Sequence, residues 1–178
     1  MSIFTEQEAK ALLDKVLALS KADECTVSLS GSVDGNIRFA LNNISTSGIV
    51  SNADLAVQSS FGKRVGTATI NEFDDAALER VVRRAEELAR LAPENPEFMP
   101  AVEKQDYTPS QTFSESTAAI SPEDRAQVAV DSIDPCRAEK LIAAGFLEDG
   151  QSFVAFANSK GNFGYQKATN FNYTRTVR

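Results

Sequence analysis

Residues 54–96 read DLAVQSSFGKRVGTATINEFDDAALERVVRRAEELARLAPENP, and this stretch decides the fold. In its first half, apolar and polar residues alternate with the period of two that is typical of half-buried strands, over 55–61 and 65–69. Gly62 and Gly66 bracket the reversal between the two runs, where a positive φ or a close backbone approach is easiest without a Cβ. The first half therefore predicts a β-hairpin.

The second half of the stretch changes to the period of an amphipathic helix. Asp74 is placed to cap this helix, and Phe73 is placed to staple onto Leu78. The apolar positions are Leu78, Val81, Val82, Ala85, Leu88, Ala89 and Ala92. The opposite face carries Glu79, Arg80, Arg83, Arg84, Glu86, Glu87 and Arg90. Because glutamates interleave the arginines, we interpret this face as solvated rather than as a nucleic-acid stripe.

The residues before this stretch predict one helix and a pair of strands. Thr5-Glu6-Gln7-Glu8 is a capping box for a helix that ends near Lys21. An alternating run from Cys25 predicts a strand, Asp34-Gly35 predicts a hairpin turn, and 37–41 predicts the returning strand. Residues 42–48 then predict a polar break or a bulge.

The segment 93–120 contains four prolines and has no periodicity, so we expect a long Pro-rich loop within the domain. Four large apolar side chains lie in it, namely Phe98, Met99, Tyr107 and Phe113. They either dock on the core or line a substrate or subunit contact, and docking is the favoured interpretation.

After this loop the pattern predicts a broken helix and further strands. Ser121 is placed to cap a helix with Pro122 in its first turn, and Pro135 predicts a break before a restart that Gly145 ends. A hairpin is expected to turn at 148–150, and a second turn at 158–161 leads into an alternating strand over 163–177. The last strand ends the chain, so we expect residues 1–178 to be one domain cut from a longer protein.

Together these elements predict an α+β fold, in which an antiparallel (mixed) sheet packs against two to three helices. The open edge of the last strand suggests that Thr169 and Phe171 accept a peptide by β-augmentation, which is a hypothesis.

Composition excludes several kinds of chemistry. The chain has no histidine, which removes every Ser-His and Cys-His nucleophile pair and every imidazole zinc site. Cys25 and Cys136 are isolated, and Cys25 has the setting of a small buried hydrophobe. A net charge of −7 argues against nucleic acid or an anionic membrane as the main partner, and no apolar run is long enough for a membrane span. We therefore expect a cytoplasmic protein and assign no catalytic, cofactor-binding or metal-binding residue.

Three pieces of the chain together resemble the N-terminal half of the TldD/PmbA family, which is often labelled as modulators of DNA gyrase. They are SLSGS at 28–32 with GNIRFALNNISTSG at 35–48, the stretch 60–98, and GFLEDGQSFVAFANSKGNFGYQ at 145–166. The resemblance implies that residues 1–178 are the single N-terminal α/β domain of a protein more than twice this length, which forms homo- or heterodimers. TldD-type members resemble zinc metallopeptidases that process or degrade small peptides, whereas PmbA-type members lack their His-Glu-x-x-x-His motif.

The resemblance carries no metal ligand onto this chain, so any zinc would belong to a part of the protein beyond Arg178. Two functions follow as expectations. The chain is the inert N-terminal domain of a TldD/PmbA-type zinc metallopeptidase, or it is a non-catalytic scaffold for dimerisation or substrate binding. A role as a gyrase-associated regulator rests on the family label alone.

Overall fold

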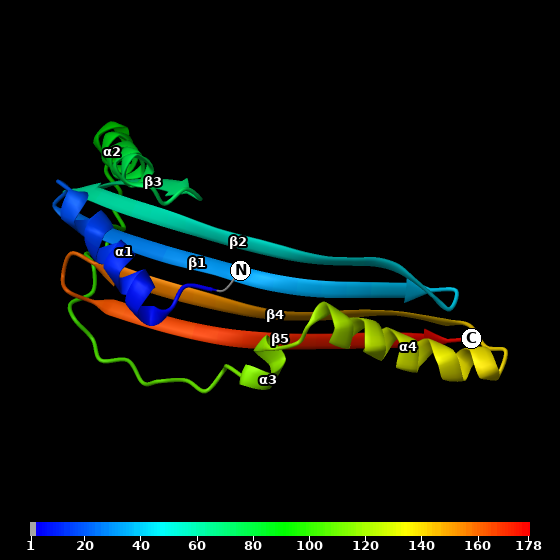
Figure 1. Ribbon diagram of the computed structural model, residues 1–178. Helices are drawn as coiled ribbons and strands as arrows, with labels where there is room; N and C mark the ends of the chain where they lie inside the picture. The colour runs from blue at the N-terminus through cyan, green and yellow to red at the C-terminus, as the bar shows by residue number, and fades with distance from the viewer. Residues whose placement is uncertain (1–2) are drawn as a thin grey trace.

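A computed structural model describes residues 3–178 as one long antiparallel sheet with helices on one of its faces (Figure 1). Five strands lie in the order β3-β2-β1-β4-β5, so the predicted α+β class is confirmed. The elements are α1 (Glu6–Leu19), β1 (Glu24–Ala40), β2 (Asn43–Phe61), β3 (Arg64–Ile70), α2 (Asp75–Leu91), α3 (Glu115–Ala118), α4 (Pro122–Ala138), β4 (Ala143–Asn158) and β5 (Phe163–Val177).

The hairpin and the helix predicted within residues 54–96 are both present. β2 turns into β3 through Gly62, whose φ is +56°. Gly66 allows a close approach, because a Cβ at this position would lie 2.4 Å from the carbonyl oxygen of Ala85 on α2. Asp74 caps α2 by accepting the Ala77 N–H at 3.0 Å. Helix α2 therefore packs directly on β3.

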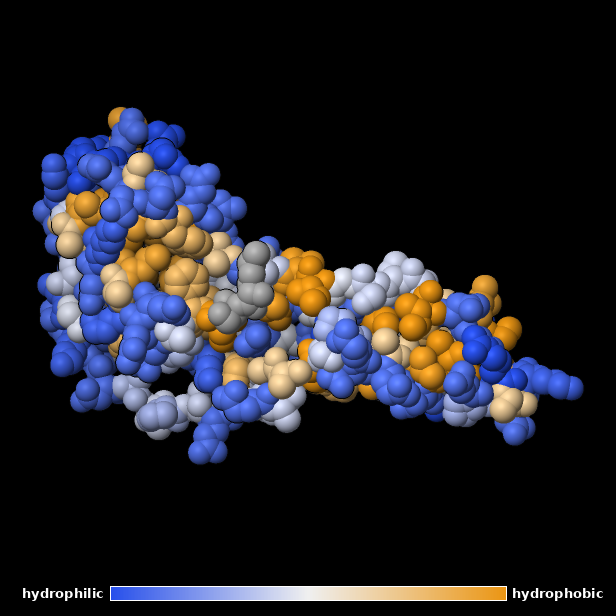
Figure 2. All heavy atoms as spheres, viewed as in Figure 1, coloured by the Kyte–Doolittle hydropathy of each residue, from blue (hydrophilic) through white to orange (hydrophobic). Residues whose placement is uncertain are grey.

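The sheet side chains that face the helices form two separate apolar clusters, and Figure 2 shows apolar residues at both ends of the molecule. The larger cluster packs α1 and α2 on β1, β2 and β4, and its central residues are Leu13, Val27, Leu55, Val82 and Ala155. The smaller cluster packs α4 on the far ends of β1 and β4 and consists of Ile37, Phe39, Ala129, Ile133, Cys136, Ala143 and Leu147. The middle of the sheet lies between these two clusters.

Two predicted turns are wrong, because each lies in the middle of an unbroken strand. Asp34-Gly35 belongs to β1 and 148–150 belongs to β4, and the two segments pair with each other across the sheet. The actual β1–β2 turn is at Leu41-Asn42, where both residues have positive φ values of 50° and 59°. The Asn42 side chain stabilises this turn by accepting the Ala143 N–H at 2.7 Å and donating to the Leu141 carbonyl at 2.8 Å. A register shift opposite Arg38 and Phe39 confirms the expected bulge, but β2 has no break.

The prediction for the segment around Pro135 is also wrong. Helix α4 runs through Pro135 without a break and ends at Ala138, so no helix restarts and Gly145 lies within β4. Pro135 is in the last turn, where the missing N–H removes a single helical hydrogen bond. The cap prediction is confirmed, because Ser121 and Asp124 form a capping box with Pro122 at the first position.

Residues 92–114 run without helix or strand, and the short helix α3 follows, so the expected loop 93–120 is not wholly irregular. The loop first follows the sheet face opposite the helices, where the Ala101 N–H donates to Glu24 at 2.9 Å and Asn158 donates to the Val102 carbonyl at 2.8 Å. It then reaches the outer edge of β5, where the Thr169 N–H donates to the Thr112 carbonyl at 3.0 Å.

Candidate functional site: the central ion pair and the sheet surfaces

The most buried ionic contact lies in the middle of the sheet, between the two apolar clusters. Arg125 of α4 reaches Asp149 of β4, and its Nη1 lies 2.9 Å from both carboxylate oxygens. The two side chains are 3 % and 8 % exposed. The Nε of Arg125 is buried and has no hydrogen-bond partner among the described residues. A buried pair of this kind costs desolvation energy and contributes mainly by fixing geometry.

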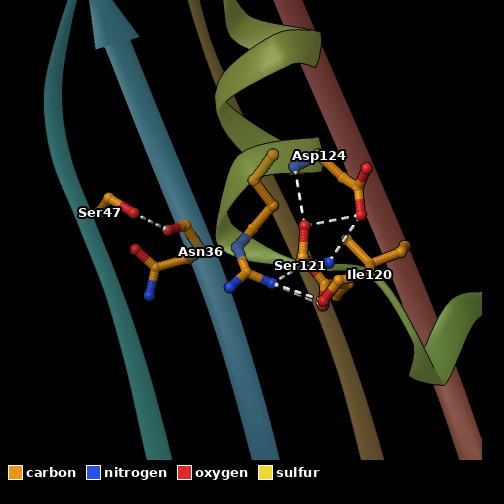
Figure 3. A network of polar contacts seen from close by, with 7 residues as sticks. Asn36, Ser47, Ile120, Ser121 and Asp124 are labelled. Carbon is orange, nitrogen blue, oxygen red and sulfur yellow. Dashed lines mark hydrogen bonds and ion pairs between the residues drawn. The ribbon is translucent and has the colours of Figure 1, made fainter.

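Gly35 makes room for this ion pair. It lies opposite Asp149 in the register of β1 and β4, and a Cβ on it would lie 2.2 Å from Nη1 of Arg125. The start of α4 is held beside the pair, and Figure 3 shows the bonds between Ser121 and Asp124 there. These contacts hold the pKa of Asp124 below its usual value, because the Ser121 N–H and hydroxyl both donate to the carboxylate. The ion pair therefore anchors α4 to the centre of the sheet.

A small cavity of about 80 Å³ adjoins the ion pair. Its wall includes Thr117 and Ile120, from the end of the long connection that leads into α4, and Gln151 from β4. One nitrogen of the Arg125 guanidinium bonds both oxygens of Asp149, and both side chains are buried. The arrangement provides structural anchoring rather than catalysis.

A second buried acidic residue joins α1 to α2. Glu86 is 2 % exposed, accepts the Lys21 N–H at 2.5 Å, and accepts from Arg83 at 2.7 Å. Arg83 also donates to the Leu19 carbonyl at 2.7 Å. The predicted position of Glu86 on the solvated face of α2 is wrong, because its carboxylate accepts the N–H of Lys21, which lies just after the end of α1. No local pattern in the sequence indicates this contact.

The arginines of α2 are otherwise occupied by neighbouring groups. Arg80 bonds Glu72 at 2.7 Å and Arg84 bonds Glu87 at 2.9 Å. The guanidinium of Arg90 lies 4.3 Å from the centre of the Phe61 ring instead of pairing with Glu86. Apart from Glu86, the charged residues of this face therefore agree with the interpretation of a solvated helix face.

The two cysteines lie in different apolar clusters and are both buried. Burial raises the pKa of the Cys25 thiol, which therefore stays protonated at neutral pH and reacts poorly with electrophiles. The interpretation of Cys25 as a small buried hydrophobe is confirmed.

The large apolar side chains of the loop divide into docked and exposed residues. The ring of Tyr107 packs edge-on against Phe156, and its hydroxyl donates to Asn162 at 3.0 Å. Phe113 lies under the ammonium of Lys167, at 3.7 Å from the ring centre. Met99 is 84 % exposed, so the docking interpretation does not extend to it.

The turn that joins β4 to β5 depends on one asparagine, as its sequence predicts. The side-chain oxygen of Asn158 accepts the N–H groups of Lys160 and Asn162 at 3.0 and 3.1 Å. The edge of β5 is less open than the sequence suggested, because the Thr169 N–H already bonds Thr112. A peptide cannot pair at Thr169 while the loop stays in this position.

Comparison with known proteins identifies the class of this fold. The structure of TldE from Thermococcus kodakarensis matches with a TM-score of 0.78 and 16 % identity, over 95 % of this chain and 42 % of that one. A putative modulator of DNA gyrase from Bacteroides thetaiotaomicron matches with a TM-score of 0.79 and 16 % identity, over 97 % of this chain and 41 % of that one. A putative modulator of a DNA gyrase from Thermotoga maritima matches with a TM-score of 0.76 and 12 % identity, over 95 % of this chain and 42 % of that one.

Part of the sequence matches a family model. Residues 25–89, which span β1, β2, β3 and most of α2, match the family model for PmbA/TldA metallopeptidase domain 1. No curated protein sequence matches the chain. Over residues 25–89 the chain therefore matches the first domain of the PmbA/TldA family, and it spans about two fifths of the length of the solved structures whose fold it shares.

Proposed function

We propose that the chain is the non-catalytic N-terminal domain of a TldD/PmbA-type zinc metallopeptidase that processes or degrades small peptides in the cytoplasm. The observation that carries this proposal is the match of residues 25–89 to the first domain of that metallopeptidase family. The solved structures that it resembles are more than twice as long as this chain, so the peptidase site would lie in the remainder of a longer protein.

The residues of this chain do not fit the zinc that the family implies. The sequence has no histidine, and among residues 3–178 no three acidic or cysteine side chains gather into a group that could hold a metal ion. Asp149 is engaged by Arg125, and the two cysteines lie in separate clusters. We therefore assign no zinc ligand to this chain, and its proposed role is to support and present peptides to the rest of the protein.

A scaffold function without metal chemistry is the second candidate. The resemblance to TldE and to proteins described as gyrase modulators leaves the type of the longer protein open. The long sheet, with helices on one face only, favours a role in dimerisation or in substrate binding. In the part of the chain that the structure describes, no helix is both long and apolar enough to cross a membrane.

Two measurements test these proposals. Zinc content and peptide hydrolysis are measured on the purified 178-residue chain, and we expect neither zinc nor turnover. Stoichiometric zinc with EDTA-sensitive turnover would falsify the non-catalytic role. The coding frame beyond Arg178 then separates the two candidates, since a His-Glu-x-x-x-His motif there supports the peptidase and its absence from a continuing frame supports the scaffold.

A further inference from the structure

The core between the helices and the sheet is divided into two halves that share no buried residue. α1 and α2 pack on one half of the sheet through the larger apolar cluster, and α4 packs on the other half through the smaller one (Figure 1). Between the two clusters, β1 presents Gly31, Val33 and Gly35 to the helix side, and β4 presents Asp149 and Gln151 opposite the last two. Glycines and polar side chains make few apolar contacts, so the packing of one half is coupled only weakly to the packing of the other.

Helix α4 buries fewer apolar side chains than α2, although both helices have 17 residues. The buried apolar residues of α2 are Ala77, Leu78, Val81, Val82, Ala85 and Ala89, and those of α4 are Ala129, Ile133 and Cys136. Two further buried positions of α4 are polar, namely Arg125 and Ser132. The free energy gained on packing rises with the apolar area that is buried. Apolar packing therefore holds α4 to the sheet less firmly than it holds α2.

The start of α4 is held by the ion pair at the centre of the sheet. Nη1 of Arg125 lies 2.9 Å from both oxygens of Asp149 and 3.5 Å from the carbonyl oxygen of Ile120. Nε of Arg125 is buried without a partner in the part of the chain that the structure describes, so it lacks the hydrogen bond that water would supply. The pair thus fixes the position of the helix, but separation of α4 from the sheet would return both charges and this N–H group to water.

The other polar contacts of α4 are made with the same half of the sheet. The hydroxyl of Ser132 lies 2.5 Å from that of Tyr173 on β5, and Arg137 donates to the carbonyl oxygen of Asn42 at 2.6 Å. Tyr173 pairs with Leu147, which belongs to the smaller cluster, and Asn42 forms the β1–β2 turn. These contacts do not reach the larger cluster, so they can break while α1 and α2 stay packed.

We propose that α4 opens from the sheet as one cooperative unit under native conditions, while α1 and α2 stay packed, and that the Arg125–Asp149 pair is the latch that holds α4 closed. Local openings of this kind occur where few apolar contacts are buried. The open form uncovers the carboxylate of Asp149 and the apolar side chains of Ile37, Phe39 and Leu147, so the protein has two native conformations that differ on this face of the sheet. The proposal rests on contacts within this chain and does not depend on peptidase activity.

Native-state hydrogen exchange of the 178-residue chain tests this proposal. The protection factor of an amide is its exchange rate in an unfolded chain divided by its rate in the protein. The amides of Ala129 and Ile133 should have protection factors at least about tenfold below those of Leu13 and Val82, because they exchange through the local opening. Low concentrations of urea should lower the protection of Leu13 and Val82 more steeply, since the opening that frees these amides exposes more surface.

Substitutions in the two halves separate a local opening from global unfolding. Arg125→Met removes the latch and should lower the protection of the α4 amides by about 100-fold or more. Val82→Ala is the matched control in the larger cluster. It should lower the protection of the α2 amides by about tenfold or more and leave that of α4 unchanged, because α4 opens while α2 stays packed. Ile133→Ala removes an apolar contact of α4 and should act on the same amides as Arg125→Met, which provides a second test of the α4 contacts.

Two kinds of result would overturn the proposal. Equal protection of α2 and α4 in the wild-type protein, or an equal effect of Val82→Ala on both helices, would show that the chain opens as a single unit. Protection of α4 that neither Arg125→Met nor Ile133→Ala lowers would show that these contacts do not govern its opening. Circular dichroism establishes that each variant is folded before its exchange is compared.

Discussion

Gly35 and Asp149 lie opposite each other on β1 and β4, and Arg125 occupies the space over Gly35 to reach the carboxylate of Asp149. The two Asp-Gly pairs of the chain, at 34–35 and 149–150, meet in this register. Each glycine fits a close approach, since a Cβ on Gly35 would meet Arg125 and one on Gly150 would meet the carboxylate of Asp34. The centre of the sheet is therefore packed around two glycines, and neither Asp-Gly pair forms a turn.

Gly35→Ala should destabilise the fold by about 3 kcal/mol, because the new Cβ displaces Arg125 from a buried ion pair. Gly48→Ala is the matched control on β2, since a Cβ there meets nothing within 4 Å. It should leave the free energy of unfolding unchanged or raise it by about 0.5 kcal/mol. Urea unfolding measures both, and equal effects of the two substitutions would contradict the role of Gly35.

The Arg125–Asp149 pair should behave as a coupled unit. Arg125→Met alone should cost about 3–5 kcal/mol, because it leaves the Asp149 charge buried without a partner. Adding Asp149→Leu should recover part of this loss, so that the double variant is more stable than the sum of the single variants predicts. A double-mutant cycle by urea unfolding measures the coupling, and strictly additive effects would refute it.

Glu86 should matter far more for stability than its neighbour Glu87. Glu86→Gln removes a buried charge that accepts from Lys21 and Arg83, and should cost about 1–3 kcal/mol. Glu87→Gln removes one partner of an exposed pair and should change stability by about 0.5 kcal/mol or less. Hydrogen exchange at the Lys21 amide should quicken only in the first variant. Equal protection of this amide in both variants would show that Glu86 does not hold α1.

Acid should loosen the first turns of α1 and α4. The pKa of Glu8 is lowered by the N–H and hydroxyl of Thr5, and that of Asp124 by those of Ser121. The two carboxylates therefore bind protons more readily in the unfolded chain than in the folded protein. The stability that they add to the fold is present above the ordinary carboxyl pKa and is lost as the pH falls through the lowered pKa values.

Thermal unfolding between pH 7 and pH 3 measures this loss. Ser121→Ala should make the dependence on pH shallower, because Asp124 then loses the hydroxyl that donates to it. Ser110→Ala, in the long loop, is the control and should leave the dependence unchanged. A wild-type profile that Ser121→Ala does not alter would contradict the role of this capping box.

The sequence predicted correctly the caps and turns that are formed by residues close together in the chain. The capping boxes at Thr5 and Ser121, the cap at Asp74 and the hairpin through Gly62 were all confirmed, because each is closed by residues a few positions away. The family resemblance was confirmed over residues 25–89.

The errors arose where the cause lies far away in the chain. Asp34-Gly35 has the composition of a hairpin turn, but Arg125 fills the space over its glycine. Glu86 has the spacing of an exposed residue, but it binds an N–H beyond the end of α1. The full length of β2 was missed because the wrong turn at Asp34 placed the returning strand at 37–41, most of which belongs to β1.

The position of β1 in the middle of the sheet has a consequence for how the chain folds. β1 pairs with β2 through a two-residue turn, but its other neighbour, β4, begins only at Ala143. Contacts between distant parts of a chain form slowly. We therefore expect a ribosome-bound chain to close the β1–β2 hairpin early, and to leave one side of β1 open until β4 has been synthesised. During that interval the open side of β1 is exposed, and the nascent protein is then most in need of a chaperone.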